Sequence, residues 1–127
     1  VVYYNTQISY NEKLSHQMYA GADFLLMPSR VEPCGLNQLY AMRYGTMPLV
    51  RKTGGLKDTV PDFGNEGGYG ITFIQASVKD ITQAMQRALK LYNNQKQLNT
   101  LRETMMKVNN SWEQSAKKYI DLYTSIQ

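Results

Sequence analysis

The spacing of apolar residues divides the chain into two parts. Residues 1–76 alternate short apolar runs with helical patterns, whereas residues 77–127 carry helical patterns throughout. The apolar runs predict strands at 1–4 with an extension toward Ile8, at 24–27, at 47–50 and at 71–74. Helical spacing predicts helices at 11–22 and from Leu36 to Gly45. Repeated strand–helix–strand units are typical of a parallel sheet with right-handed crossovers. We therefore expect an α/β fold, with a partial Rossmann-like parallel sheet followed by C-terminal helices.

The two halves contain further local signals. Ser77 with Asp80 resembles a capping box, Asn93-Asn94 interrupts the helical pattern, and Ser111 with Gln114 forms a Ser-x-x-Gln box that opens a last helix. This last helix is expected to pack in the core or to dock onto a further domain. Its apolar stripe consists of Trp112, Ala116, Tyr119, Ile120 and Tyr123. The apolar positions of the helix after Leu36 are Leu36, Leu39, Tyr40 and Met42.

Glycines and prolines gather after the third predicted strand. The segment Thr53-Gly54-Gly55-Leu56 predicts a tight turn, and residues 57–70 predict an irregular, mobile surface loop. Two interpretations of Thr53, Gly54 and Gly55 stay open, a plain turn or a backbone cradle at a cleft.

Composition adds bounds on the kind of protein. The chain has 127 residues, 43% of them hydrophobic, which is enough for one compact domain with a core. It begins with Val1 and shows no signal-peptide or membrane-spanning pattern, so we expect a piece of a longer protein. Its single cysteine, Cys34, cannot form an internal disulfide, which favours a reducing compartment and predicts a cytoplasmic location.

Charge and motifs exclude several classes of site. The net charge is +4, but the basic residues are dispersed, so neither nucleic acid nor membrane is expected as a partner. This balance suits an anionic small ligand such as a nucleoside diphosphate. The chain has no Gly-Lys-Ser/Thr loop, no His-Glu-x-x-His and no paired cysteines, so no metal and no cofactor are expected.

The candidate chemistry lies in residues 28–38, which follow the strand at 24–27 and lead into a helix. Ligands of parallel α/β sheets bind at the carboxyl ends of the strands. The backbone amides of residues 35–37 would form an anion site at the helix start, where Gly35 allows close approach of a diphosphate. Glu32 could place a carboxylate on a sugar beside that diphosphate, an arrangement suited to glycosyl transfer. The alternative is that Glu32 is a solvated loop residue.

A family resemblance extends almost without gaps from Tyr10 to Val60. It is carried by Ala22-Asp23, Pro28-Ser29-Arg30, Glu32-Pro33-Cys34-Gly35-Leu36, Gln38-Leu39-Tyr40, Tyr44-Gly45-Thr46, Pro48-Leu49-Val50-Arg51, Thr53-Gly54-Gly55-Leu56 and Asp58-Thr59-Val60. Together with Ser111-Trp112, these residues resemble the bacterial glycogen and starch synthases. The resemblance implies a retaining glycosyltransferase with two facing Rossmann-like domains, of which residues 1–127 would be the C-terminal, donor-binding one.

The resemblance also implies roles for individual residues. Glu32 looks like the catalytic-site glutamate that contacts the transferred glucose, and Cys34 would lie beside the donor. Gly35, Leu36 and Asn37 look like the backbone segment at the diphosphate, although Asn37 stands where the family commonly has Thr. The remaining donor residues are Tyr10 and Tyr40. Tyr10 aligns with the tyrosine that stacks on the base, and Tyr40 stands where many related transferases have a ribose-binding glutamate, a departure that starch synthases share.

Two side chains invite other interpretations. Cys34 has no base nearby in the sequence, and His16 is expected on the polar, solvated side of its helix, so a Cys–His catalytic pair is not expected. A small residue packed beside the donor is the better interpretation of Cys34.

The implied activity is transfer of glucose from a nucleotide-sugar donor, ADP-glucose before UDP-glucose, to the non-reducing end of an α-1,4-glucan. The acceptor domain, a Lys-x-Gly-Gly-Leu segment and the basic clamp on the donor phosphates would lie upstream of Val1, so this fragment alone is expected to be inactive. Two alternatives stay open: a non-catalytic module that binds a nucleotide or a glucan, and the donor half of another retaining glycosyltransferase.

Overall fold

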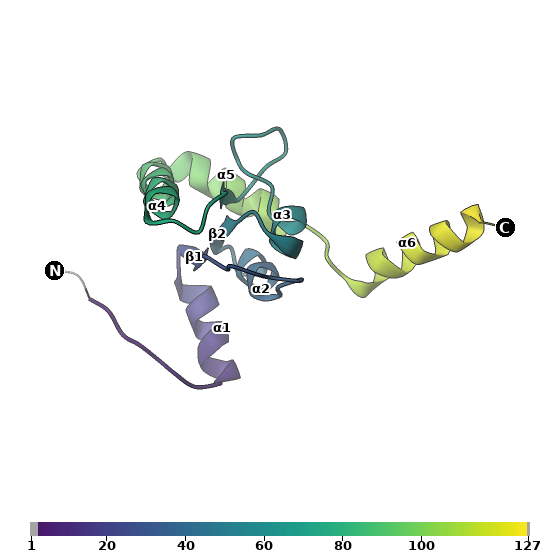
Figure 1. Cartoon of the computed structure of the whole chain (residues 1–127), viewed down its shortest axis with the longest axis horizontal. Coiled ribbons are helices and arrows are strands. Elements are labelled where there is room, and N and C mark those ends of the chain that lie inside the picture. The colour runs from purple at the N-terminus through teal and green to yellow at the C-terminus, as the bar shows by residue number, and fades with distance from the viewer. Residues whose placement is uncertain (1–2, 127) are drawn as a thin grey trace.

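The chain forms a three-stranded parallel sheet covered by helices. A computed structural model describes residues 3–126, and Figure 1 shows the sheet at the centre of the packed part. The strands β1 (Phe24–Met27), β2 (Met47–Arg51) and β3 (Ile71–Phe73) lie in the order β1-β2-β3. Phe24 pairs with Met47 and Leu49 with Ile71, both in parallel register. The predicted α/β fold with a parallel sheet is therefore confirmed.

The core lies around the central strand. Met47, Leu49 and Val50 of β2 are each at most 3% exposed. The helices α2 (Asn37–Arg43) and α3 (Gly54–Thr59) pack against β2, and α4 (Val78–Tyr92) packs against β3 and β2. The helix α5 (Gln95–Met106) packs against both α2 and α4. Because both faces of β2 are covered, its apolar run follows the pattern of a buried parallel strand.

The prediction of a first strand is wrong for the described part of its range. Val1 and Val2 lie outside the described residues, and residues 3–8 have no regular secondary structure. Tyr3, Tyr4 and Ile8 are each at least 89% exposed. Figure 1 shows this segment running apart from the sheet. A strand requires a neighbour for its backbone hydrogen bonds, and this segment has none among the described residues.

The first helix begins and ends close to its prediction. The helix α1 (Glu12–Gly21) has Asn11 as its N-cap, whose side-chain oxygen accepts a hydrogen bond from the Leu14 amide at 2.9 Å. This bond satisfies one of the amides that a helix start leaves free. No described residue of α1 is buried, and Met18 is 60% exposed. The helix therefore lies on the surface of the packed body.

The segment after β2 differs most from its prediction. The expected glycine turn is instead the start of α3, and the expected mobile loop is partly buried, with Val60 and Gly70 inside. Asp62 anchors this loop, because its carboxylate accepts hydrogen bonds from Arg87 at 2.5 and 3.0 Å and from the Thr72 amide at 2.8 Å. The frequent glycines and prolines indicated irregular backbone correctly but could not reveal these long-range bonds.

The starts of the next two helices agree with the capping box at Ser77 and the interruption at Asn93-Asn94. Ser77 caps α4 by accepting a hydrogen bond from the Asp80 amide at 3.1 Å, and Asn94 caps α5 in the same way toward Gln97 at 3.2 Å. The residues of their apolar stripes that are buried are Ala84, Ala88, Leu91, Leu98 and Met105. None of the helices within residues 3–126 is both long and apolar enough to span a membrane.

The last helix, α6 (Trp112–Ser125), extends away from the rest of the structure, as Figure 1 shows. Its start at Trp112 agrees with the prediction, but the side chain of Ser111 makes no capping hydrogen bond. Trp112 is 89% exposed, and no described residue of α6 is buried. The stripe is therefore not part of the core of this chain.

Candidate functional site

The predicted site loop leaves the carboxyl end of β1 and leads directly into α2. The helix begins at Asn37, so the amides of residues 35–37 lie at its start, where an α-helix has no internal partners for its amides. Glu32 is half-buried in the loop. Ser29 Oγ donates to Glu32 Oε2 across a long 3.5 Å. The Glu32 carboxylate is therefore held only weakly by the described residues and has capacity to accept hydrogen bonds from a ligand.

The loop rests on the backbone at the start of α3. The Gly55 amide donates to the carbonyl oxygens of Glu32 and Pro33, each at 3.3 Å. A Cβ atom at Gly54 would overlap the Glu32 carbonyl oxygen, and one at Gly55 would collide with the Cys34 carbonyl oxygen. Gly54 also has a φ of +45°, which favours glycine. Both glycines therefore allow backbone-to-backbone packing beneath the loop.

A buried amide holds the loop from the side of α2. Gln38 is fully buried, and its Nε2 donates to the carbonyl oxygens of Cys34 at 3.2 Å and Gly35 at 2.9 Å. The same nitrogen donates to Thr59 Oγ1 at 3.1 Å. Gln38 was not predicted as a site residue, because the apolar positions assigned to this helix included Leu36 and Tyr40. These two side chains are 53% and 46% exposed. The buried stripe of α2 is instead Gln38, Ala41 and Met42.

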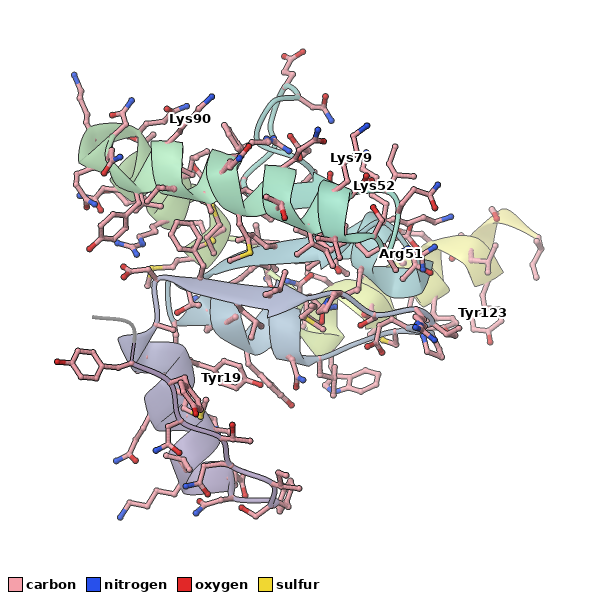
Figure 2. The ribbon with its side chains drawn as sticks, turned by 60° about the vertical axis from the view of Figure 1, so that its left-hand side comes forward. Tyr19, Arg51, Lys52, Lys79, Lys90 and Tyr123 are labelled. Carbon is pink, nitrogen blue, oxygen red and sulfur yellow. The ribbon has the colours of Figure 1, made fainter. Side chains whose placement is uncertain are left out.

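Arg51 connects the carboxyl ends of the strands. Its Nη1 donates to the carbonyl oxygens of Ser29 at 3.3 Å and Arg30 at 2.7 Å, and its Nε donates to the Ile74 carbonyl oxygen at 2.9 Å. Figure 2 shows Arg51 with Lys52 and Lys79 at this end of the sheet, whereas Lys90 lies at the other end of α4. The segments that follow β1 and β3 are thus joined through one side chain of β2.

The structure divides the predicted site residues into two groups. Tyr10, Asn37 and Tyr40 line one cavity of about 1060 Å³ between the segment before α1, α1 itself and the start of α2. Glu32, Cys34 and Gly35 are not among its lining residues. Glu32 and Cys34 instead contact the segment that starts α3, and Gly35 contacts Gln38 of α2. The two groups meet where the loop joins α2, at Leu36 and Asn37. Tyr10 itself is 92% exposed.

Aromatic side chains form the wall of this cavity between α1 and α2. Tyr19 of α1 faces Tyr40 of α2 with ring centroids 6.2 Å apart, and Figure 2 shows Tyr19 on the side of α1 toward α2. Burial, together with the neighbouring Tyr40, raises the pKa of the Tyr19 hydroxyl above its ordinary value of 10.0. Tyr19 therefore stays neutral near pH 7 and offers the cavity a hydroxyl donor rather than a charge.

His16 is exposed, as predicted, and it also makes a contact that the sequence did not reveal. His16 Nδ1 forms a hydrogen bond of 2.9 Å with the Tyr44 hydroxyl, which links α1 to the end of α2. This nitrogen is thus engaged with Tyr44 and not with Cys34, which is exposed. Within residues 3–126, no cluster of three or more His, Cys, Asp or Glu side chains is arranged to hold a metal ion.

Curated glycogen synthases are similar in sequence to this chain. Glycogen synthase from Flavobacterium johnsoniae is 56% identical over 123 residues, covering 97% of this chain and 26% of the relative. Glycogen synthase from Finegoldia magna is 50% identical over 94% of this chain and 25% of its own length. The chain therefore spans about a quarter of the length of the curated relatives that it matches.

Solved structures share the fold. The catalytic domain of starch synthase IV from Arabidopsis thaliana, bound to ADP and acarbose, matches 93% of this chain and 25% of its own with a TM-score of 0.83 and 41% identity. Sucrose-phosphate synthase from Thermosynechococcus elongatus matches 85% of this chain and 26% of its own with a TM-score of 0.62 and 26% identity.

These matches confirm the resemblance to glycogen and starch synthases that the motifs predicted. A broader family model, described as glycosyl transferases group 1, matches residues 6–105. Since this range is well over half of the chain, the protein belongs to the group 1 glycosyl transferases.

Proposed function

We propose that this chain is the donor-binding, C-terminal part of a glycogen or starch synthase. The whole enzyme would transfer glucose from a nucleoside-diphosphate glucose to the non-reducing end of an α-1,4-glucan with retention of configuration. One observation carries the proposal: the loop with Glu32 leaves the carboxyl end of β1 and runs into the free amides that start α2. Residues 1–76 would supply this α/β layer, and residues 77–127 its helical tail.

The chemistry follows from what each group can stabilise. Breaking the bond between glucose and the diphosphate places negative charge on the leaving phosphate and positive charge on the sugar. The amides of Gly35, Leu36 and Asn37 would stabilise the phosphate charge by donating hydrogen bonds at the positive end of α2. Glu32 would accept hydrogen bonds from sugar hydroxyls and stabilise the positive sugar, with Cys34 packed beside the donor.

The cavity between α1 and α2 would hold the nucleoside part of the donor. Tyr10 offers an exposed ring for stacking on a base, and Asn37 and Tyr40 line the same cavity. The Arabidopsis relative with a TM-score of 0.83 was solved with ADP, which supports ADP-glucose before UDP-glucose as the donor. Gly54 and Gly55 would support the loop from beneath and need not touch the donor, with Thr53 preceding them.

The test is a chimera with a close relative. Residues 1–127 would replace the matching quarter of Flavobacterium johnsoniae glycogen synthase, and transfer of glucose to glycogen would be measured with ADP-glucose and with UDP-glucose. We expect elongation with ADP-glucose, and a loss of about 10²–10³-fold in kcat for Glu32→Gln, which keeps the shape but removes the charge.

The exposed glutamate Glu66, in the loop after α3, supplies a matched control, and Glu66→Gln should leave kcat unchanged. A Glu32→Gln chimera that elongates glycogen as fast as the unaltered chimera would contradict the assignment. Faster transfer from UDP-glucose than from ADP-glucose would support the transferase assignment and contradict the proposed preference for ADP-glucose.

A further inference from the structure

The strongest unassigned feature of the site is a fully buried polar side chain. Gln38 has no exposed surface, although it lies in the first turn of α2 on the same buried face as Ala41 and Met42. Burying an amide costs free energy unless its polar atoms find partners. An apolar side chain would fill this position without that cost, so the reason for an amide must lie in the bonds that it makes.

The bonds of Gln38 join three segments of the chain. Its Nε2 reaches the carbonyl oxygens of Cys34 and Gly35 in the loop and the hydroxyl of Thr59 in α3. Thr59 Oγ1 in turn donates to the Gly55 carbonyl oxygen at 2.8 Å. The amide of Gly55 donates back to the loop at Glu32 and Pro33. A closed network therefore runs from α2 through the loop to α3 and back.

The amide oxygen of Gln38 restricts the loop by close packing. Gln38 Oε1 is buried and has no hydrogen-bond partner among the described residues. A Cβ atom at Gly35 would lie 2.6 Å from it, and Gly35 has a φ of +74°. The loop backbone therefore passes close above the amide, in a conformation that favours glycine. Such tight packing leaves the loop little freedom to shift against α2.

Direct contacts of Glu32 are too weak to set its position alone. Among residues 3–126, its carboxylate has only the 3.5 Å contact with Ser29, and its carbonyl oxygen accepts one 3.3 Å bond from Gly55. Shorter bonds hold the loop on both sides of Glu32: Arg51 donates to the Arg30 carbonyl oxygen at 2.7 Å before it, and Gln38 and Thr59 make bonds of 2.9 and 2.8 Å on the side of α2. The placement of Glu32 relative to the amides of α2 thus depends on this network.

We propose that Gln38 is a positioning residue for glucosyl transfer, which holds the loop of Glu32 at a fixed distance from the amides that start α2. Thr59 extends its reach to α3. The proposal rests on the proposed function, because it assigns Gln38 a purpose in the same reaction. Gln38 touches neither donor nor acceptor and acts through the backbone of Cys34 and Gly35.

The experiment compares three variants in the Flavobacterium johnsoniae chimera and in the 127-residue chain. Gln38→Met keeps the side-chain length and removes both polar groups, Thr59→Val removes the hydroxyl, and Leu98→Val is a control that loosens the core at α5, away from the loop. Measured quantities are kcat, the KM for ADP-glucose, the thermal midpoint, and hydrogen exchange of the Gly55 amide.

We expect kcat to fall by about 100-fold in Gln38→Met and about 10-fold in Thr59→Val, with KM changed less than about threefold, because displacement by about 1 Å has effects of this size. The Gly55 amide should exchange faster in both variants. Leu98→Val should lower the thermal midpoint without changing kcat or exchange at Gly55.

The outcomes separate this proposal from the one on which it rests. A Gln38→Met variant that folds and has normal kcat overturns the positioning role. A fall in kcat for Leu98→Val also overturns it, because loss of stability alone would then lower kcat. If Gln38→Met does not fold, an unchanged kcat and unchanged Gly55 exchange in Thr59→Val overturn it instead. If Glu32→Gln retains activity, the proposed function fails, whatever the exchange measurements give.

Discussion

At the scale of single residues, Asp62 gathers hydrogen bonds from three parts of the chain. Its carboxylate accepts from Arg87, from the Gly64 amide, and from both the amide and hydroxyl of Thr72. Arg87 also lies over the ring of Phe63, 4.8 Å from its centroid. Burial raises the pKa of Asp62, but these hydrogen bonds outweigh it and lower the pKa from 3.8 to about 2.

This pKa predicts how stability depends on pH. The carboxylate is favoured in the folded state, so its contribution is complete above pH 3.8 and is lost as the pH falls through about 2. We expect Asp62→Asn to lower the free energy of unfolding by about 2 kcal/mol at pH 7, toward the low end for a buried pair, because Arg87 is partly exposed. Urea unfolding at pH 7 and pH 3 measures both effects.

The difference between wild type and Asp62→Asn should shrink between pH 4 and pH 2. Asp58→Asn, which alters an exposed carboxylate of α3, is the matched control and should change stability little. A constant difference between wild type and Asp62→Asn over this pH range would show that the charge of Asp62 is not what stabilises the loop.

At the scale of elements, α1 is attached to the body by polar bonds rather than by a buried face. Thr46 Oγ1 lies within hydrogen-bond distance of the carbonyl oxygens of Tyr19 and Ala22 at the carboxyl end of α1, and the single proton of its hydroxyl is shared between them. His16 and Tyr44 form a further hydrogen bond, between α1 and the end of α2. Because no described residue of α1 is fully buried, these bonds and the ring contacts of Tyr19 with Tyr40 and Tyr44 determine where the helix lies and hence the shape of the cavity beside it.

Removing the Thr46 hydroxyl should loosen α1 selectively. Thr46→Val preserves the side-chain volume but removes the one hydroxyl proton that the two carbonyl oxygens share, which costs about 1–3 kcal/mol. We expect the amides of α1 to exchange hydrogen about 10-fold faster or more, with β2 unaffected, in a mass-spectrometric exchange measurement. Thr100→Val, at an exposed hydroxyl of α5, is the control. Equal protection of α1 in both variants would refute this attachment.

The elements themselves were largely predictable, and their tertiary roles were not. The strands at 24–27 and 47–50 and the starts of α1, α4 and α5 follow from apolar runs and capping residues, which act locally. The first strand failed because a strand depends on a distant neighbour. The Gln38 network could not be derived from the sequence, since it joins residues that are 21 positions apart, although a polar residue in register with Ala41 and Met42 was a usable signal.

At the scale of the whole molecule, the described chain consists of a packed body and the projecting helix α6. Large apolar side chains of α6 stay exposed, among them Trp112 at 89% and Tyr123 at 61%, and Figure 2 shows Tyr123 on this helix beyond the sheet. Burial of apolar surface is the main source of folding free energy. In this chain α6 therefore contributes little to the stability of the body.

Truncation tests this division. A chain that ends at Asn110 should keep its thermal midpoint within about 2 °C, because a change well under 1 kcal/mol shifts a domain of this size by less than that. A chain that ends at Asn94 also loses α5, whose Leu98 and Met105 are buried, and should unfold at room temperature. Circular dichroism melts compare the two. A large loss of stability in the chain that ends at Asn110 would mean that α6 packs on the body.

Arg51 has a mechanical consequence for the end of the sheet where the donor is proposed to bind. One guanidinium of β2 holds the backbone after β1 and after β3, so neither segment can swing outward without breaking charged hydrogen bonds. The loop that contains Glu32 is therefore held in a fixed position against the sheet. Any closing movement over a bound sugar nucleotide would have to be made by a different part of the enzyme, while this edge moves with the sheet as one rigid block.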